Sequence, residues 1–138
     1  MPSVVLLIIA ILIIGILVFI AISLTGNKVY SFDKEEYQAD FLAIENSLTK
    51  DNELSFNAVV VEADKLLDKA LMEMGLPGKT MGERMKAAQN KFSSNNSIWY
   101  AHKMRNQIAH ERNFKVDYNK AAHALKAYRQ ALKDLGAI

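Results

Sequence analysis

The feature that most constrains the fold is an apolar segment from Val4 to Leu24 that contains no charged residue. As an α-helix, a segment of this length spans roughly 31 Å, which matches the hydrocarbon core of a bilayer. A helix packed on one side of a protein core would carry polar residues on its outer face, and this segment has no such face. We therefore predict a single transmembrane helix.

A cleaved signal peptide is the alternative interpretation of this segment. Signal peptides begin with basic residues, have shorter apolar runs and end at a small-residue cleavage site, and none of these features is present. Lys28 and Lys34 follow the segment, whereas the residues before it include neither Lys nor Arg. The positive-inside rule then places the C-terminal domain in the cytoplasm. We therefore expect a single-pass protein of the cell membrane with a cytoplasmic C-terminal domain.

The chain after Thr25 is polar enough to be soluble and long enough for one domain with a single core. Glycine and proline are sparse, and apolar residues recur with a helical period. The absence of cysteine excludes disulfides and thiolate metal sites. The predicted fold is all-α: a transmembrane helix followed by an up-and-down bundle of four to five helices.

Capping signals set the predicted helix boundaries. Asp33 and Thr80 each precede a glutamate by three residues, which is the capping-box pattern, and Asp117 caps the last helix. The predicted helices cover 33–50, 55–74, 81–92, 97–112 and 117–136. The chain is accordingly divided into a transmembrane anchor (1–25), a juxtamembrane helix (26–54) and a helical bundle (55–138).

Charge is distributed unevenly along the chain. Residues 33–83 hold 12 acidic and 5 basic residues, a net charge of −7, whereas residues 84–133 hold 11 basic and 2 acidic residues, a net of +9. A basic region suits a polyanion such as RNA, or anionic lipid headgroups beside a membrane. The alternative is that acidic helices simply pack against basic helices in one bundle.

The motif that carries chemistry is Arg105-Asn106-Gln107-Ile108-Ala109-His110. Arginine can hold a phosphate, and histidine can move a proton near neutral pH. On a regular helix Arg105 and His110 lie about 140° apart, so they converge only if the helix ends or bends near Ala109. Asn106 and His110 are four residues apart and share a face, so Asn106 can orient the imidazole.

The Arg-Asn-x3-His run, late in a helical bundle, resembles the signature of HEPN-domain proteins, many of which are RNases. The resemblance covers roughly 59–136. It implies a helical bundle that forms a homodimer, with two motifs in one composite cleft. It also implies that Arg105 and His110 are the active pair and that Asn106 is the accessory polar residue. Some members use an acidic residue in an earlier helix, a place that Glu62 or Asp64 would take. A membrane anchor is not part of the common pattern.

If the chain resembles the active members, it cleaves RNA without a metal or other cofactor. His110 would act as general base or acid toward the 2′-hydroxyl, and Arg105 would neutralise the phosphorane. The alternative roles are a surface ion pair for Arg105 and a helix C-cap for His110. The rival function is a non-enzymatic, membrane-tethered interaction module whose partner protein the sequence does not identify.

Other candidate residues are better explained by structure. His102 and His110 are eight residues apart, too far for a helical metal pair, so no metal site is expected. His123 fits a surface or bundle-edge position. Trp99 and Tyr100 can stack bases but fit core anchors better. Four methionines flank the turn at 75–78 and fit core filling, with a plastic partner surface as the alternative (Met72, Met74, Met81 and Met85).

Overall fold

The computed structural model describes residues 2–25 and 30–138, and this part of the chain contains six α-helices and no strand. The helices are α1 (Pro2–Thr25), α2 (Lys34–Ser47), α3 (Glu53–Glu73), α4 (Met81–Ala87), α5 (Asn95–His110) and α6 (Tyr118–Leu135). The all-helical prediction is therefore confirmed over the described ranges. Lys28, which contributed to the predicted orientation, lies outside the described residues.

Helix α1 has the length and composition of a membrane span. Its segment Ser3–Ser23 has a mean hydropathy of 3.6, and none of the tested window is buried against the rest of the described chain. A helix that is apolar on every face over this length is favoured in an apolar solvent such as a bilayer core. The expected apolar N-terminal helix is thus present.

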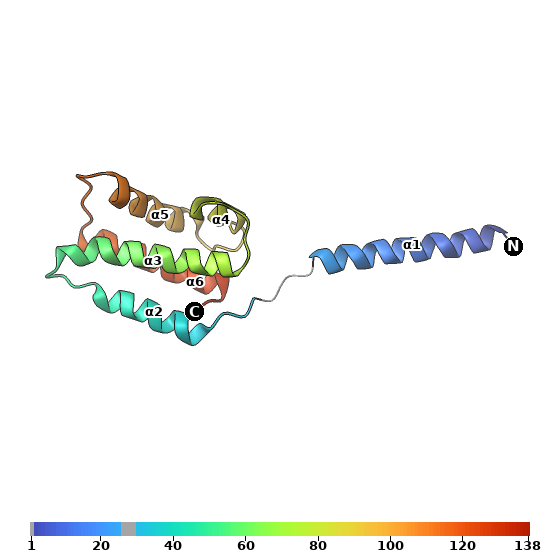
Figure 1. The fold of residues 1–138 in the computed structure, drawn as a ribbon, viewed down its shortest axis with the longest axis horizontal. Helices are drawn as coiled ribbons and strands as arrows, with labels where there is room; N and C mark the ends of the chain where they lie inside the picture. Colours follow the sequence, from blue (N-terminus) through green and yellow to red (C-terminus); the bar gives the residue numbers. More distant parts are fainter. Residues whose placement is uncertain (1, 26–29) are drawn as a thin grey trace.

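The remaining helices form a bundle around α3. Helix α3 contacts α2, α4, α5 and α6, and α5 also packs on α6. The four longer helices of the bundle run in alternating directions along the chain, and short α4 joins α3 to α5 (Figure 1). This arrangement is up-and-down, as short loops between helices predict.

Buried apolar side chains from every helix of the bundle form one core. From α2, Tyr37 and Phe41 are each 1% exposed, so this helix shares the core of α3 and α6. Burying a side chain of this size is worth about 1.5–3 kcal/mol. The predicted core methionines Met74, Met81 and Met85 are buried, whereas Met72 is exposed.

Side-chain caps begin three of the helices as the sequence predicts. The carboxylate of Asp33 accepts from the amide of Glu36, Thr80 Oγ1 accepts from Glu83, and Asp117 accepts from Lys120. At the other end of α6, Gly136 adopts a left-handed conformation with φ of 79°, which residues with a side chain rarely adopt.

Several predicted helix boundaries differ from those observed, and one of them concerns the motif. Helix α2 ends at Ser47 rather than Lys50, and α3 and α5 each begin two residues earlier than predicted. Helix α4 ends at Ala87 rather than near Phe92, because the chain turns after Ala88 and brings Phe92 into the core. Helix α5 ends at His110 rather than Arg112, since Glu111 takes an extended conformation. The motif therefore occupies the last turn and a half of α5.

Candidate functional site

Helix α5 positions the candidate site by burying its apolar face against the bundle. Ile98, Ala101 and Met104 recur at helical spacing and are at most 2% exposed. Packing of this face on α3 and α6 fixes the rotation of α5 about its axis. The polar residues beside this face are thereby brought against α3 and α6.

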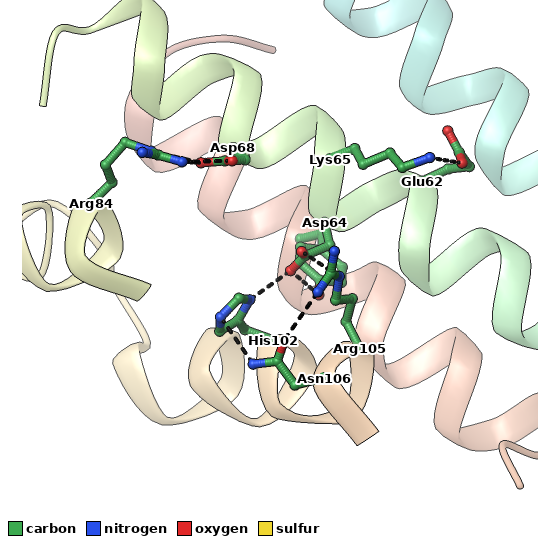
Figure 2. Close-up of polar contacts among 9 residues, drawn as sticks. Glu62, Asp64, Lys65, Asp68, Arg84, His102, Arg105 and Asn106 are labelled. Carbon is green, nitrogen blue, oxygen red and sulfur yellow. Dashed lines mark hydrogen bonds and ion pairs between the residues drawn. The ribbon is translucent and has the colours of Figure 1, made fainter. Parts of the chain in front are cut away.

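A buried carboxylate on α3 is the centre of the polar contacts. Asp64 is 3% exposed, and its side chain contacts residues from α5 and α6. His102 Nδ1 lies 2.9 Å from Oδ1, and Arg105 Nε lies 3.3 Å from Oδ2 (Figure 2). The hydroxyl of Tyr128 donates to Oδ1 at 2.9 Å. Three donors compensate a charge that would otherwise be costly to bury.

The environment of Tyr128 keeps its hydroxyl protonated. Burial, the charge of Asp64 and the hydrogen bond to that carboxylate together raise the pKa of Tyr128 well above its ordinary value. The phenol therefore remains a hydrogen-bond donor at neutral and moderately alkaline pH. Its hydrogen bond joins α6 to α3 inside the bundle.

Asn106 connects Arg105 to His102. Its Oδ1 accepts from Arg105 Nη1 at 3.2 Å, and its Nδ2 lies 3.3 Å from His102 Nε2 (Figure 2). Because the guanidinium can only donate, it fixes which end of the amide faces His102. Nε2 then accepts from Asn106, and the ring proton lies on Nδ1, which faces Asp64.

Arg105 is held in place while part of it stays accessible. Its contacts with Asp64 and Asn106 use two of the five N–H donors of a guanidinium. The side chain is 34% exposed, in contrast to the carboxylate behind it at 4%. Two of its donors orient the guanidinium, and its exposed part can contact an anion. Because the side chain is already ordered, binding costs less conformational entropy.

His110 lies apart from this network. It is the last residue of α5 and is exposed. The helix stays regular to this point, and the amide of Glu111 bonds to the carbonyl of Gln107. Arg105 and His110 therefore leave α5 on different faces, and the bend that would bring them together within one chain does not occur. His110 lies at the C-terminus of α5, where the helix dipole favours a positive charge.

The structure distinguishes between the two acidic residues that the sequence left open. Glu62 is exposed and pairs with Lys65 at 2.8 Å on the surface, whereas Asp64 is buried and contacts Arg105 (Figure 2). Asp64 is therefore the acidic residue of the earlier helix that lies beside the motif.

Sequence reasoning missed two members of this network. The sequence suggests His102 only as a possible metal ligand, and the helical spacing of α6 marks Tyr128 only as one residue of an apolar stripe. The available signal was the four-residue spacing of His102 and Asn106, which places them on one face of α5. That face was assigned to Asn106 and His110, but the amide of Asn106 contacts His102 on the preceding turn instead.

An open cavity of about 750 Å³ lies beside the network, between α4 and α5. Asn106 and His102 contribute to its wall, together with Gly82 of α4. Trp99 and Tyr100 also contribute and are 38% and 47% exposed. The interpretation of these two aromatic residues as core anchors is therefore wrong.

The remaining histidine, His123, lies on α6 beside Tyr100 of the cavity wall. His123 is exposed and stacks edge-on against Tyr100, with ring centroids 5.8 Å apart. Over residues 2–25 and 30–138, no group of three or more potential metal ligands comes together.

Comparisons with known proteins give no family for this chain: no family model, no curated protein and no solved structure matches it.

Proposed function

We propose that this protein is a membrane-anchored, HEPN-like protein that binds and cleaves RNA without a metal. The observation that carries the proposal is the state of Arg105, which Asp64 and Asn106 hold in place while a third of its side chain remains accessible. A pre-oriented guanidinium is suited to the dianionic oxygens of a phosphorane.

The proposed chemistry uses the substrate's own 2′-hydroxyl. His110 removes its proton, the 2′-oxygen attacks the adjacent phosphorus, and the bond to the 5′-oxygen breaks. The protonated His110 of a second copy donates the proton that the leaving 5′-oxygen takes up. The products are a 2′,3′-cyclic phosphate and a 5′-hydroxyl. General acid–base catalysis of this kind is worth roughly 10²–10⁴-fold in rate.

A homodimer would resolve the separation of Arg105 and His110 within one chain. Because the two residues lie on different faces of α5, a second copy can bring its own His110 toward the first copy's Arg105. Two imidazoles in one composite cleft would also provide a base and an acid. The exposed position of His110 supports this arrangement.

The membrane anchor places this activity at a surface. Helix α1 spans the cell membrane in this proposal, and the bundle lies in the cytoplasm, where RNA is available. The basic character of residues 84–133, with a net charge of +9, supports binding of a polyanion.

The test is incubation of the full chain, in detergent micelles, with mixed RNA and EDTA, beside a variant that carries both Arg105→Ala and His110→Ala. The proposal expects fragments with 2′,3′-cyclic phosphate ends from the wild type alone. Fragments with other ends, or equal cleavage by the variant, would contradict it.

One observation favours a second candidate, a non-enzymatic interaction module. Both ring nitrogens of His102 have partners, as do both ends of the Asn106 amide, which is typical of a polar network that stabilises a fold. In that case the Asp64 contacts orient α5, and a partner binds the bundle. A folded chain that leaves RNA intact would favour this second candidate.

A further inference from the structure

The cavity between α4 and α5 contains the combination of groups that recognises a nucleobase. Trp99 and Tyr100, adjacent on α5, both line it and keep more than a third of their surface exposed. Large exposed aromatic rings at a concave site are platforms for a flat ligand. The same wall carries the amide of Asn96, which can donate to and accept from a base edge.

Two further residues give the cavity its charge and its link to the motif. Lys103 is exposed at the cavity wall, one helical turn after Trp99. Asn106 belongs both to the cavity wall and to the contacts of Arg105. A ligand in the cavity therefore lies one side chain away from the guanidinium that is proposed to bind phosphate.

The space itself depends on a glycine of α4. A Cβ added at Gly82 would lie 3.8 Å from the Trp99 ring and 3.9 Å from His102 Nε2, which is ordinary van der Waals contact. Alanine is therefore tolerated there, whereas a longer side chain would fill the space over the ring. His102 is 8% exposed, so a buried polar side chain forms part of this wall.

We propose that this cavity binds one unpaired base of an RNA strand, with Trp99 as the stacking platform and Lys103 against a neighbouring phosphate. Trp99, Lys103 and His110 follow one another along the exposed side of α5 over eleven residues, or about 16 Å. That length suits a short stretch of single strand running from the cavity toward the end of the helix. Duplex RNA would not present an unstacked base, so the inference specifies single-stranded substrate. It rests on the proposed function for its ligand.

Trp99 is the only tryptophan of the chain, so tryptophan fluorescence, excited at wavelengths that the tyrosines do not absorb, reports on this cavity alone. The experiment titrates the full chain in detergent micelles with a 2′-O-methyl RNA hexamer, which cannot be cleaved through its 2′-oxygen. A base stacked on Trp99 should quench the fluorescence in a saturable manner. Titration with the matching duplex should quench it at least tenfold less effectively.

Variants at Gly82 separate the cavity from the fold. Gly82→Leu should raise the Kd of the hexamer at least tenfold, and Gly82→Ala should keep the wild-type Kd. Both substitutions raise helix propensity, so neither is expected to unfold α4. Lys103→Ala should weaken binding several-fold and lower the salt slope by about one.

A double variant, with Arg105→Ala and His110→Ala, separates the test of the base site from the test of RNA cleavage. The same hexamer titration is repeated with this variant. Two results together support the base site, whether or not the wild type cleaves RNA. The double variant should keep saturable quenching, with a Kd raised by the lost phosphate contact, and Gly82→Leu should need at least tenfold more hexamer than the wild type. Absence of quenching, or equal binding by Gly82→Leu and wild type, overturns the base site even if the wild type cleaves RNA.

Discussion

Arg105 on α5 meets the buried carboxylate of Asp64 on α3, with 3.3 Å between Nε and Oδ2. The same carboxylate accepts from Tyr128 of α6 and contacts His102. One acidic residue thus joins the three helices that form the centre of the bundle. The placement of the guanidinium and the stability of the fold are consequently linked.

Asp64→Asn should lower both stability and any activity that depends on Arg105. The substitution removes the buried charge that three donors share, and breaking such a buried pair costs about 3 kcal/mol in the free energy of unfolding. Urea unfolding followed by circular dichroism measures this loss. Glu62→Gln is the matched control, because its exposed pair with Lys65 is worth less than about 1 kcal/mol. Equal effects of the two variants would contradict the central place of Asp64.

Tyr128→Phe should lower the free energy of unfolding at pH 8 by about 1.5 kcal/mol, since a hydrogen bond to a charged acceptor is lost. The wild type should also lose stability above about pH 10. Burial and the Asp64 carboxylate raise the pKa of Tyr128 in the folded state, so above the unfolded-state pKa of about 10 only the unfolded chain releases this proton.

The pH dependence is measured as unfolding free energy at pH 8 and pH 11. In Tyr128→Phe the loss between these two values should be smaller than in the wild type. Tyr100→Phe removes an exposed hydroxyl and controls for the substitution itself. If Tyr128→Phe loses as much unfolding free energy between pH 8 and pH 11 as the wild type, ionisation of this phenol does not cause the loss.

The helices and most of their starts could be predicted from the sequence because they depend on local patterns. Asp33, Thr80 and Asp117 cap helices through contacts three residues away, which a sequence displays directly. The end of α5 was placed two residues late, because helix ends fray and no glycine marks this one.

The polar network could not be predicted because its members come from three helices. Asp64 and Tyr128 are 64 residues apart, so no local spacing shows that their side chains meet. His102 and His110 lie four residues before and after Asn106, so both share its face of α5. Only the packing of the bundle decides that Asn106 contacts His102. Likewise, Trp99 is 38% exposed because it lines the open cavity between α4 and α5, which its hydrophobicity alone does not show.

Arg84→Lys should destabilise the bundle although it preserves the charge. Arg84 is 9% exposed, forms two 2.8 Å hydrogen bonds with Asp68 of α3, and donates to the carbonyl of Gly78. Lysine cannot reproduce this planar fork, so a loss of about 2 kcal/mol is expected in urea unfolding. Lys86→Ala, on the exposed side of the same helix, should change stability by less than about 0.5 kcal/mol.

Membrane orientation can be tested with one introduced cysteine, because the chain has none of its own. Asn113→Cys lies in the exposed loop after α5. A cytoplasmic bundle predicts that a membrane-impermeant maleimide labels this residue only after the cells are opened. Labelling in intact cells would place the bundle outside and would remove its access to cytoplasmic RNA.

The most direct test of the central claim is the rate of RNA cleavage by the full chain in EDTA, compared among wild type, Arg105→Ala, His110→Ala and Arg112→Ala. Arg112 is an exposed arginine of the same basic region and serves as the charge-matched control. The account predicts that each of the first two substitutions lowers the rate by at least 10²-fold, while Arg112→Ala retains it within about threefold. No cleavage by the folded wild type, or equal rates for all four proteins, would contradict the account.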